Sequence, residues 1–188
     1  FQKRYFKNKN NKLIPFFEKF KSYKNRKAVL IALGTSDYKK TKLIKKTLKK
    51  YFKKQNIKNI KFYIDPKIFD NEFKKMGFVK ADFSTKMYKE VKFAIIKPGL
   101  GTIEECLKRG IIIISYTKNT YSEFFHNSKI LIKNKLGYSF QTIEKSVNFI
   151  IKNFDNIELI KQHENNCKNL KWEGEKKVEK YLLKRANI

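Results

Sequence analysis

The amino-acid sequence predicts an α/β fold in which a parallel β-sheet is flanked by helices. Two observations lead to this prediction. Continuous apolar runs of strand length, such as residues 28–33 and 111–116, are typical of strands that are buried on both faces. Segments whose apolar residues recur at helical spacing lie between these runs, and regular alternation of strands and helices is the pattern of a parallel sheet.

The first half of the chain contains the most regular elements. Residues 28–33 form the first strand. An amphipathic helix is expected over residues 40–54, because apolar residues recur on one face of it (Leu43, Ile44, Leu48, Tyr51 and Phe52). Residues 59–64 form a second strand, which ends at Asp65 and Pro66.

The later elements are shorter. In chain order we expect a strand at 78–79, a helix at 85–91, a strand at 93–96, a helix at 102–109, the strand at 111–116 and a helix at 123–134. Gly110 follows the helix at 102–109 in the position that a helix C-terminus favours. Residues 141–188 are expected to form two or three further helices.

Lysine dominates the composition of the chain. Among 188 residues there are 45 Lys and Arg against 17 Asp and Glu, a net charge of +28, and only four of these cations are arginines. Ile, Asn, Phe and Tyr are also abundant, and all of these residue types have AT-rich codons. Codon bias therefore competes with function as the reason for the charge. In either case a basic surface attracts nucleic acid, anionic lipid or phosphorylated ligands.

The composition also excludes several classes of protein. Two cysteines, Cys106 and Cys167, are too few for a disulfide framework. No apolar run approaches the ~20 residues that a membrane span needs. No cluster of His, Cys and Asp has the spacing of metal ligands, so no metal is expected. We expect His126 to be packed or exposed rather than catalytic, and His163 to face solvent.

Composition divides the chain into three parts. Residues 1–26 carry nine cations, one acid and several aromatic residues. A linker or edge segment is expected there, with a membrane-surface or nucleic-acid-binding patch as the alternative. Residues 27–140 form the α/β domain, and residues 141–188 add helices that pack on it. Because the chain does not begin with Met, we expect it to be part of a longer polypeptide.

Two loops that follow strands are rich in small residues: residues 34–37 and 98–102. Ligands of parallel sheets bind beyond the carboxyl ends of the strands, where glycines admit a close approach and the next helix directs N–H groups toward a phosphate. We expect Thr102 to cap that helix, with Glu105 at capping-box spacing, which an ordinary strand-to-helix turn would also show. The second loop matches neither the Walker pattern nor the dinucleotide fingerprint.

A carboxylate beside the second loop suits a ribose. It accepts hydrogen bonds from two neighbouring hydroxyls, and Glu105 or Glu104 could take this role. Loops from two parallel strands of one sheet can face the same crevice. One loop would then hold a diphosphate, and the other a ribose.

The order of these motifs resembles the C-terminal, nucleotide-sugar-binding domain of GT-B glycosyltransferases, and most closely the MurG-like group, which transfers GlcNAc from UDP-GlcNAc. The resemblance covers roughly residues 27–185. Its most specific part is Gly-x-Gly-Thr-Ile-x-Glu at 99–105, followed by Asn-Ser at 127–128 and Leu-Gly at 136–137. It implies a Rossmann-like fold that is one half of a GT-B enzyme.

The resemblance also implies a function. The chain would bind a UDP-sugar, expected to be UDP-GlcNAc-like, in a hexosyltransferase that passes a hexose or hexosamine to an acceptor, which can be lipid-linked. No cofactor beyond this donor substrate is implied. Since the acceptor site and the catalytic base usually belong to the other half, we expect an N-terminal domain or a separate subunit as partner and assign no catalytic residue. The implied location is the cytoplasm, with an anionic membrane surface as a further expected contact.

Binding roles follow from the same resemblance. The two glycine loops meet the phosphates, Glu105 holds the ribose hydroxyls, residues 80–83 meet the base, and the helix at 123–134 begins near the sugar. Glu123 stands where Gln is usual in the family, and the first loop lacks the usual double glycine. The implied donor-binding residues are Gly34, Thr35, Ser36, Phe83, Gly99, Leu100, Gly101, Thr102, Glu105, Glu123 and Asn127.

Two other functions stay open. A nucleotide-sugar hydrolase or epimerase would use the same fold. A basic nucleic-acid-binding module would fit the charge, but the sequence has no recognisable nucleic-acid-binding motif and few arginines to contact bases. A nucleic-acid partner is therefore not expected.

Overall fold

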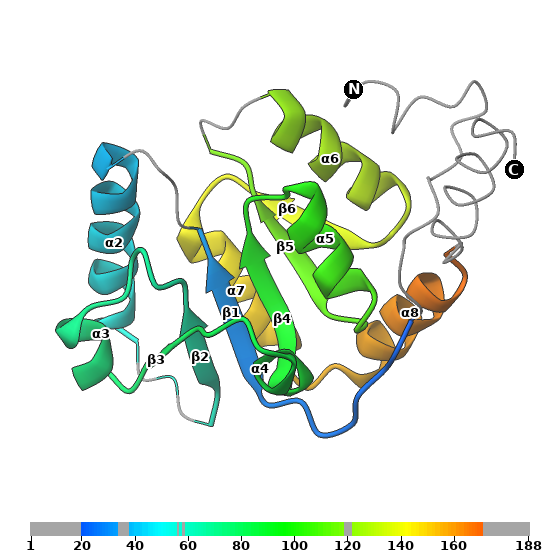
Figure 1. Ribbon diagram of the computed structural model, residues 1–188, viewed down its shortest axis with the longest axis horizontal. Helices are drawn as coiled ribbons and strands as arrows, with labels where there is room; N and C mark the ends of the chain where they lie inside the picture. The colour runs from blue at the N-terminus through cyan, green and yellow to red at the C-terminus, as the bar shows by residue number, and fades with distance from the viewer. Residues whose placement is uncertain (1–19, 34–37, 56, 58, 119–121, 171–188) are drawn as a thin grey trace, which may run out of the picture.

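The computed structural model describes residues 20–33, 38–55, 57, 59–118 and 122–170. These residues build a six-stranded sheet in which every pairing of neighbouring strands is parallel, flanked by helices on both faces (Figure 1). The strands are β1 (Ala28–Ala32), β2 (Lys61–Ile64), β3 (Val79–Lys80), β4 (Val91–Ile96), β5 (Ile112–Tyr116) and β6 (Gly137–Phe140). The helices are α2 (Tyr38–Phe52), α3 (Asn71–Lys75), α4 (Thr85–Glu90), α5 (Leu100–Leu107), α6 (Ser122–Lys133), α7 (Ile143–Asn153) and α8 (Ile157–Lys168). The predicted fold class is confirmed.

The sheet separates two apolar cores. Successive residues of a strand point to opposite faces, so Val29 and Ile31 enter one core while Ala28 and Leu30 enter the other. Helices α2, α3 and α7 cover the first face. Helices α4, α5 and α6 cover the second face, toward the viewer in Figure 1. Burial of the central strands on both faces explains their continuous apolar runs.

The strand order places the two predicted loops side by side. The order is β3-β2-β1-β4-β5-β6, so the chain moves outward in one direction from β1 and in the other direction from β4. Ala32, the last residue of β1, pairs with Ile96, the last residue of β4. Such a reversal of strand order leaves a crevice beyond the carboxyl ends of the two central strands. The segments that follow β1 and β4 therefore start at the point where this fold binds ligands.

Two elements were missing from the sequence prediction. Helix α3 has only five residues and is begun by Asp70, whose side chain accepts hydrogen bonds from the backbone N–H groups of Glu72 and Phe73. Strand β6 is short and half-buried, so it lacks the apolar run of the inner strands. Gly137 starts it because β5 passes very close: a Cβ atom there would lie 2.6 Å from the backbone oxygen of Ile113.

Helix α7 shares the first core with α2 and the sheet through Ile143, Val147 and Ile150. The division at residue 141 stays a prediction, as does that at residue 26, because residues 1–19 and 171–188 lie outside the described residues. Both cysteines are buried free thiols. No described helix is both long enough and apolar enough to span a lipid bilayer.

Candidate functional site

The first turn of α5 begins directly beyond β4. Gly99 is the N-cap residue, with an extended backbone (φ −76°, ψ 147°), and no side chain of the described residues caps the helix. The helix therefore starts at Leu100, and Thr102 is already inside its first turn. The prediction that Thr102 caps this helix with Glu105 was wrong, because the extended Gly99 lets the chain turn into the helix earlier. The leading N–H groups of a helix have no intrahelical acceptor and carry its positive dipole end.

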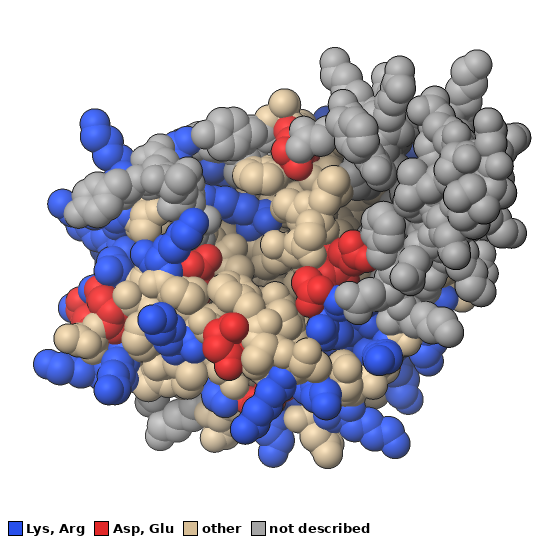
Figure 2. Space-filling view, in the orientation of Figure 1, with Lys and Arg blue, Asp and Glu red and all other residues tan. Residues whose placement is uncertain are grey.

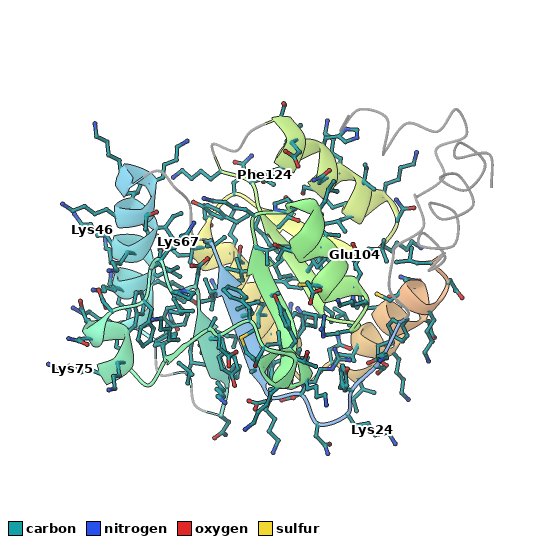
Figure 3. All side chains as sticks on the ribbon, in the orientation of Figure 1. Lys24, Lys46, Lys67, Lys75, Glu104 and Phe124 are labelled. Carbon is teal, nitrogen blue, oxygen red and sulfur yellow. The ribbon has the colours of Figure 1, made fainter. Side chains whose placement is uncertain are left out.

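Space is open above this first turn. A Cβ atom added at Gly101 would meet no atom of the described residues within 4 Å. At Gly99, by contrast, it would lie 3.8 Å from a ring carbon of Phe124, which Figure 3 places beside the loop between β4 and α5. Packing within the described residues therefore gives no reason for glycine at position 101. Open space over uncapped N–H groups suits an anionic ligand.

Asn127 fixes the loop from the other side. Its side-chain Nδ2 donates a hydrogen bond of 2.8 Å to the backbone oxygen of Pro98, and the residue is 2% exposed. Glu123 lies half-buried in the first turn of the same helix, α6. The structure thus brings Asn127 to the β4–α5 loop, where it holds the backbone in place, and it shows no contact of Glu123 with that loop among the described residues.

Glu105 lies one turn further along α5, and both of its carboxylate oxygens are engaged. Oε1 accepts a hydrogen bond from Lys108 Nζ, and Oε2 accepts one of 2.5 Å from Arg109 Nη1. Both cations are buried, whereas the Glu105 side chain is 36% exposed. The carboxylate therefore lies at the surface above two buried positive charges. Its neighbour Glu104 is half-buried on the same helix and is labelled in Figure 3.

Phe83 lies on the turn between β3 and α4. It has a left-handed backbone (φ 54°) and is 42% exposed, an uncommon combination for a large side chain. Ser84, the next residue, accepts a hydrogen bond from the Met87 backbone N–H and so caps α4. The Phe83 ring centroid lies 6.5 Å from that of Tyr88, and the Tyr88 ring is in turn covered by the Arg109 guanidinium at 4.8 Å. Phe83 and Glu105 are thus linked through Tyr88 and Arg109.

The charge around this site is mixed. Figure 2 shows acidic side chains set among uncharged surface in the middle of the face, with Lys and Arg gathered toward its left and lower edges. Within the described ranges, no group of three or more His, Cys, Asp or Glu side chains is arranged to hold a metal ion. Burial raises the pKa of Tyr88 above its usual range, so its hydroxyl stays protonated.

The predicted site residues are thus partly assembled. Gly99, Leu100, Gly101 and Thr102 form the first turn of α5 and its cap, and Glu105 follows on the same helix. The predicted residues of the first loop, Gly34, Thr35 and Ser36, lie outside the described residues.

The sequence reasoning missed Tyr88, Lys108 and Arg109. The spacing of Lys108 and Arg109 from Glu105, three and four residues, is a signal for helical ion pairs that could have found them. No local pattern points to Tyr88.

Comparison with known proteins gives a fold but no family. No family model matches the sequence, and no curated protein matches it either. The structure matches the glycosyltransferase SnogD from Streptomyces nogalater with a TM-score of 0.55 at 12% identity, over 84% of this chain and 44% of that one. It matches the glycosyltransferase SsfS6 from Streptomyces sp. SF2575, complexed with thymidine diphosphate, with a TM-score of 0.55 at 13% identity, over 86% and 43%. It matches S. aureus MnaA, solved with UDP, with a TM-score of 0.57 at 9% identity, over 87% and 47%.

The fold is that of one half of a GT-B glycosyltransferase. The chain spans less than half the length of each of these proteins. Identities of 9–13% carry the fold alone, so the MurG-like group is not singled out.

Proposed function

We propose that this chain is the donor-binding half of a glycosyltransferase and binds a nucleoside diphosphate sugar beyond the carboxyl ends of β1 and β4. The observation that carries the proposal is the first turn of α5, which is uncapped by any described side chain and lies under open space at Gly101. Helix N-termini of this kind bind phosphate through backbone N–H groups, at the switch point where the fold binds its ligands.

The surrounding residues give the donor an orientation. The diphosphate would lie against residues 99–102 and the loop at 34–37, and the ribose at Glu105 one turn along the helix. The base would lie toward Phe83, and the transferred sugar toward Glu123 at the start of α6. Asn127 would act through the Pro98 carbonyl that it holds.

The finer features of the proposal come from the sequence motif. We propose a UDP-GlcNAc-like donor, a hexose or hexosamine as the transferred group, and an acceptor that can be lipid-linked. The acceptor site and the catalytic base are proposed to lie on a second half, in the same polypeptide or in a partner subunit. The span of the chain, less than half of its structural neighbours, supports this arrangement. Cytoplasmic location and contact with an anionic membrane belong to the same proposal.

Calorimetric titration with UDP, together with a Gly101→Ala variant, tests the donor site. An alanine methyl group would occupy the space proposed for the phosphates, so we expect UDP to bind at least fivefold more weakly. Alanine also favours a helix over glycine by about 0.5–1 kcal/mol, so the free energy of unfolding should stay equal or rise. If the variant binds UDP more weakly but is as stable as the unmodified chain, the weaker binding comes from a blocked ligand site and not from misfolding. No UDP binding by the unmodified chain at millimolar concentration would contradict the proposal.

A nucleotide-sugar hydrolase or epimerase is the second candidate. The proposed donor site would serve these reactions as well, and the structural neighbour MnaA was solved with UDP. Incubation with UDP-GlcNAc and no acceptor separates the candidates, since a hydrolase releases free sugar, an epimerase yields an isomeric donor, and a transferase half leaves the donor intact.

A further inference from the structure

Two buried cations lie under the Glu105 carboxylate. Lys108 is 5% exposed and Arg109 is 8% exposed. Each contacts a different oxygen of Glu105, so the carboxylate is held at both ends and cannot rotate freely about its last bond. A carboxylate oxygen has about two acceptor positions, so each oxygen keeps one for a further donor. The partial exposure of Glu105 leaves these positions accessible to a ligand.

Arg109 is itself held in three ways. Its Nη1 donates to the Glu105 backbone oxygen at 3.0 Å as well as to the carboxylate, and its guanidinium plane lies 4.8 Å from the centroid of the buried Tyr88 ring. Its Nε is buried and has no hydrogen-bond partner among the described residues. An unpaired buried donor is costly, which indicates that the guanidinium is placed for its contact with Glu105 rather than for its own hydrogen bonding. A lysine could not satisfy the ring, the carbonyl and the carboxylate together, because it lacks the planar fork.

We propose that Arg109, fixed by Tyr88, is a positioning residue that aims the Glu105 carboxylate at the two cis hydroxyls of a ribose, so that this site selects ribonucleoside diphosphates over 2′-deoxyribonucleoside diphosphates. The inference rests on the proposed donor site. The two oxygens of one fixed carboxylate match two hydroxyls on adjacent ring carbons. A deoxyribose offers only one hydroxyl, so one of these hydrogen bonds is lost. The fold alone does not decide this choice, since structural neighbours were solved with thymidine diphosphate and with UDP.

The test measures the ratio of dissociation constants for 2′-deoxy-UDP and UDP by calorimetry. We expect the unmodified chain to favour UDP by roughly 5- to 100-fold. Glu105→Gln and Arg109→Lys should each lower this ratio at least fivefold, because UDP loses its contacts through two hydroxyls and 2′-deoxy-UDP through only one. A merely structural role of Arg109 would weaken both ligands together and leave the ratio unchanged. Glu104→Gln, a carboxylate change at the preceding residue, is the matched control and should keep the ratio.

Tyr88 provides a second pair of variants that leaves the charges in place. Tyr88→Leu removes the ring under Arg109 and should lower the ratio, whereas Tyr88→Phe keeps the ring and should preserve it. These variants report on the inference even if Arg109→Lys does not fold.

The outcomes separate the two proposals. A chain that binds neither nucleotide contradicts the proposed function. Equal binding of both nucleotides by the unmodified chain overturns the role of Arg109. The same follows if Glu105→Gln lowers the ratio but Arg109→Lys and Tyr88→Leu do not. Either outcome leaves the proposed donor site intact.

Discussion

At the residue scale, two glycines of the sequence motif occur for different physical reasons. Gly137 lies where β6 meets β5, and a Cβ atom there would be 2.6 Å from the Ile113 backbone oxygen and 3.1 Å from its Cβ. At Gly101 no atom in the described part of the chain lies within 4 Å of such a Cβ atom. Glycine at position 137 is therefore explained by strand packing, while glycine at position 101 is explained by the proposed ligand. If the proposed donor binds there, one motif combines a structural requirement with a functional one.

Gly137→Ala should destabilise the protein. Backbone atoms cannot yield as the end of a flexible side chain can, and forced overpacking typically costs about 1–3 kcal/mol. Urea unfolding, monitored by circular dichroism, measures the change in the free energy of unfolding. Gly101→Ala is the control, since the same methyl group meets no atom of residues 20–33, 38–55, 57, 59–118 or 122–170 there. Equal stability of the two variants would show that β5 and β6 do not approach as described.

His163 is a buried residue whose neighbours in the sequence are polar. It was expected to face solvent, because Gln162, Glu164 and Asn165 surround it in the sequence. That expectation was wrong: the side chain is buried, and its Nε2 lies 3.1 Å from the Ile111 backbone oxygen. His163 is one of two buried residues of α8, with Cys167, and it joins that helix to the residue that precedes β5.

The buried His163 predicts a dependence of stability on pH. Burial, with a further contribution from the positive charge of Arg26, lowers the pKa of His163 to about 4 from its ordinary 6.5. The native ring stays neutral while the unfolded ring takes up a proton below pH 6.5, so stability is complete above that pH and falls between pH 6.5 and 4. The loss amounts to about 3 kcal/mol at 1.4 kcal/mol per pH unit.

Urea unfolding at several pH values between 4 and 7 measures this slope. His163→Gln should flatten it, because no titrating group is then left at that position. Asp70, whose pKa is lowered by its lysine contacts despite the opposing effect of burial, loses its contribution only at more acidic pH and does not interfere. An unchanged slope in the variant would assign the effect to other groups.

At the element scale, sequence patterns located the inner strands of the sheet but not every helix boundary or every edge strand. β1, β4 and β5 are buried on both faces, so their apolar runs stand out in the sequence. The edge strand β6 is half-exposed, and it was not predicted from the sequence. The start of α5 was placed two residues late, because Thr-x-x-Glu at 102–105 imitates a capping box that the structure does not form.

Only those parts of the candidate site that are formed by residues close together in the sequence could be predicted. The loop at 99–102 and Glu105 follow from one short motif. The bond from Asn127 to Pro98 joins residues 29 positions apart, and the contact between Tyr88 and Arg109 joins α4 to the end of α5. No local pattern encodes contacts that the packing of separate helices creates.

Asn127→Ala should detach α6 from the β4–α5 loop. The change leaves the buried Pro98 carbonyl without its donor, which costs about 1–3 kcal/mol of unfolding free energy, and UDP should bind more weakly because the loop loses its support. Asn134→Ala is the matched control, since Asn134 makes the same 2.8 Å bond to a backbone oxygen of α6 but is exposed. Unfolding and calorimetry on both variants test the prediction, and equal losses at the two positions would contradict it.

At the scale of the whole molecule, lysines are dense on α2 within the described residues. Residues 38–54, which include α2, hold nine lysines and no acid. Asp70 and Glu72 pair with Lys45, Lys49 and Lys53 on one side of the helix. The outer side, opposite the buried core face, carries exposed lysines around Leu43, which is 61% exposed, and forms part of the left edge in Figure 2. We call these the outer lysines of α2: Lys39, Lys42, Lys46 and Lys50.

The outer lysines of α2 should dominate adsorption to anionic surfaces. Each lysine near an anionic bilayer contributes about 1 kcal/mol, so changing all four to Gln should weaken binding to phosphatidylserine vesicles at low salt by at least roughly tenfold. Vesicle co-sedimentation measures this, and raising the salt should abolish the difference, because screening removes the attraction. The control changes four exposed lysines elsewhere, Lys129, Lys133, Lys161 and Lys168, which alters the net charge equally. Equal weakening by both sets would mean that net charge, and not the face of α2, governs adsorption.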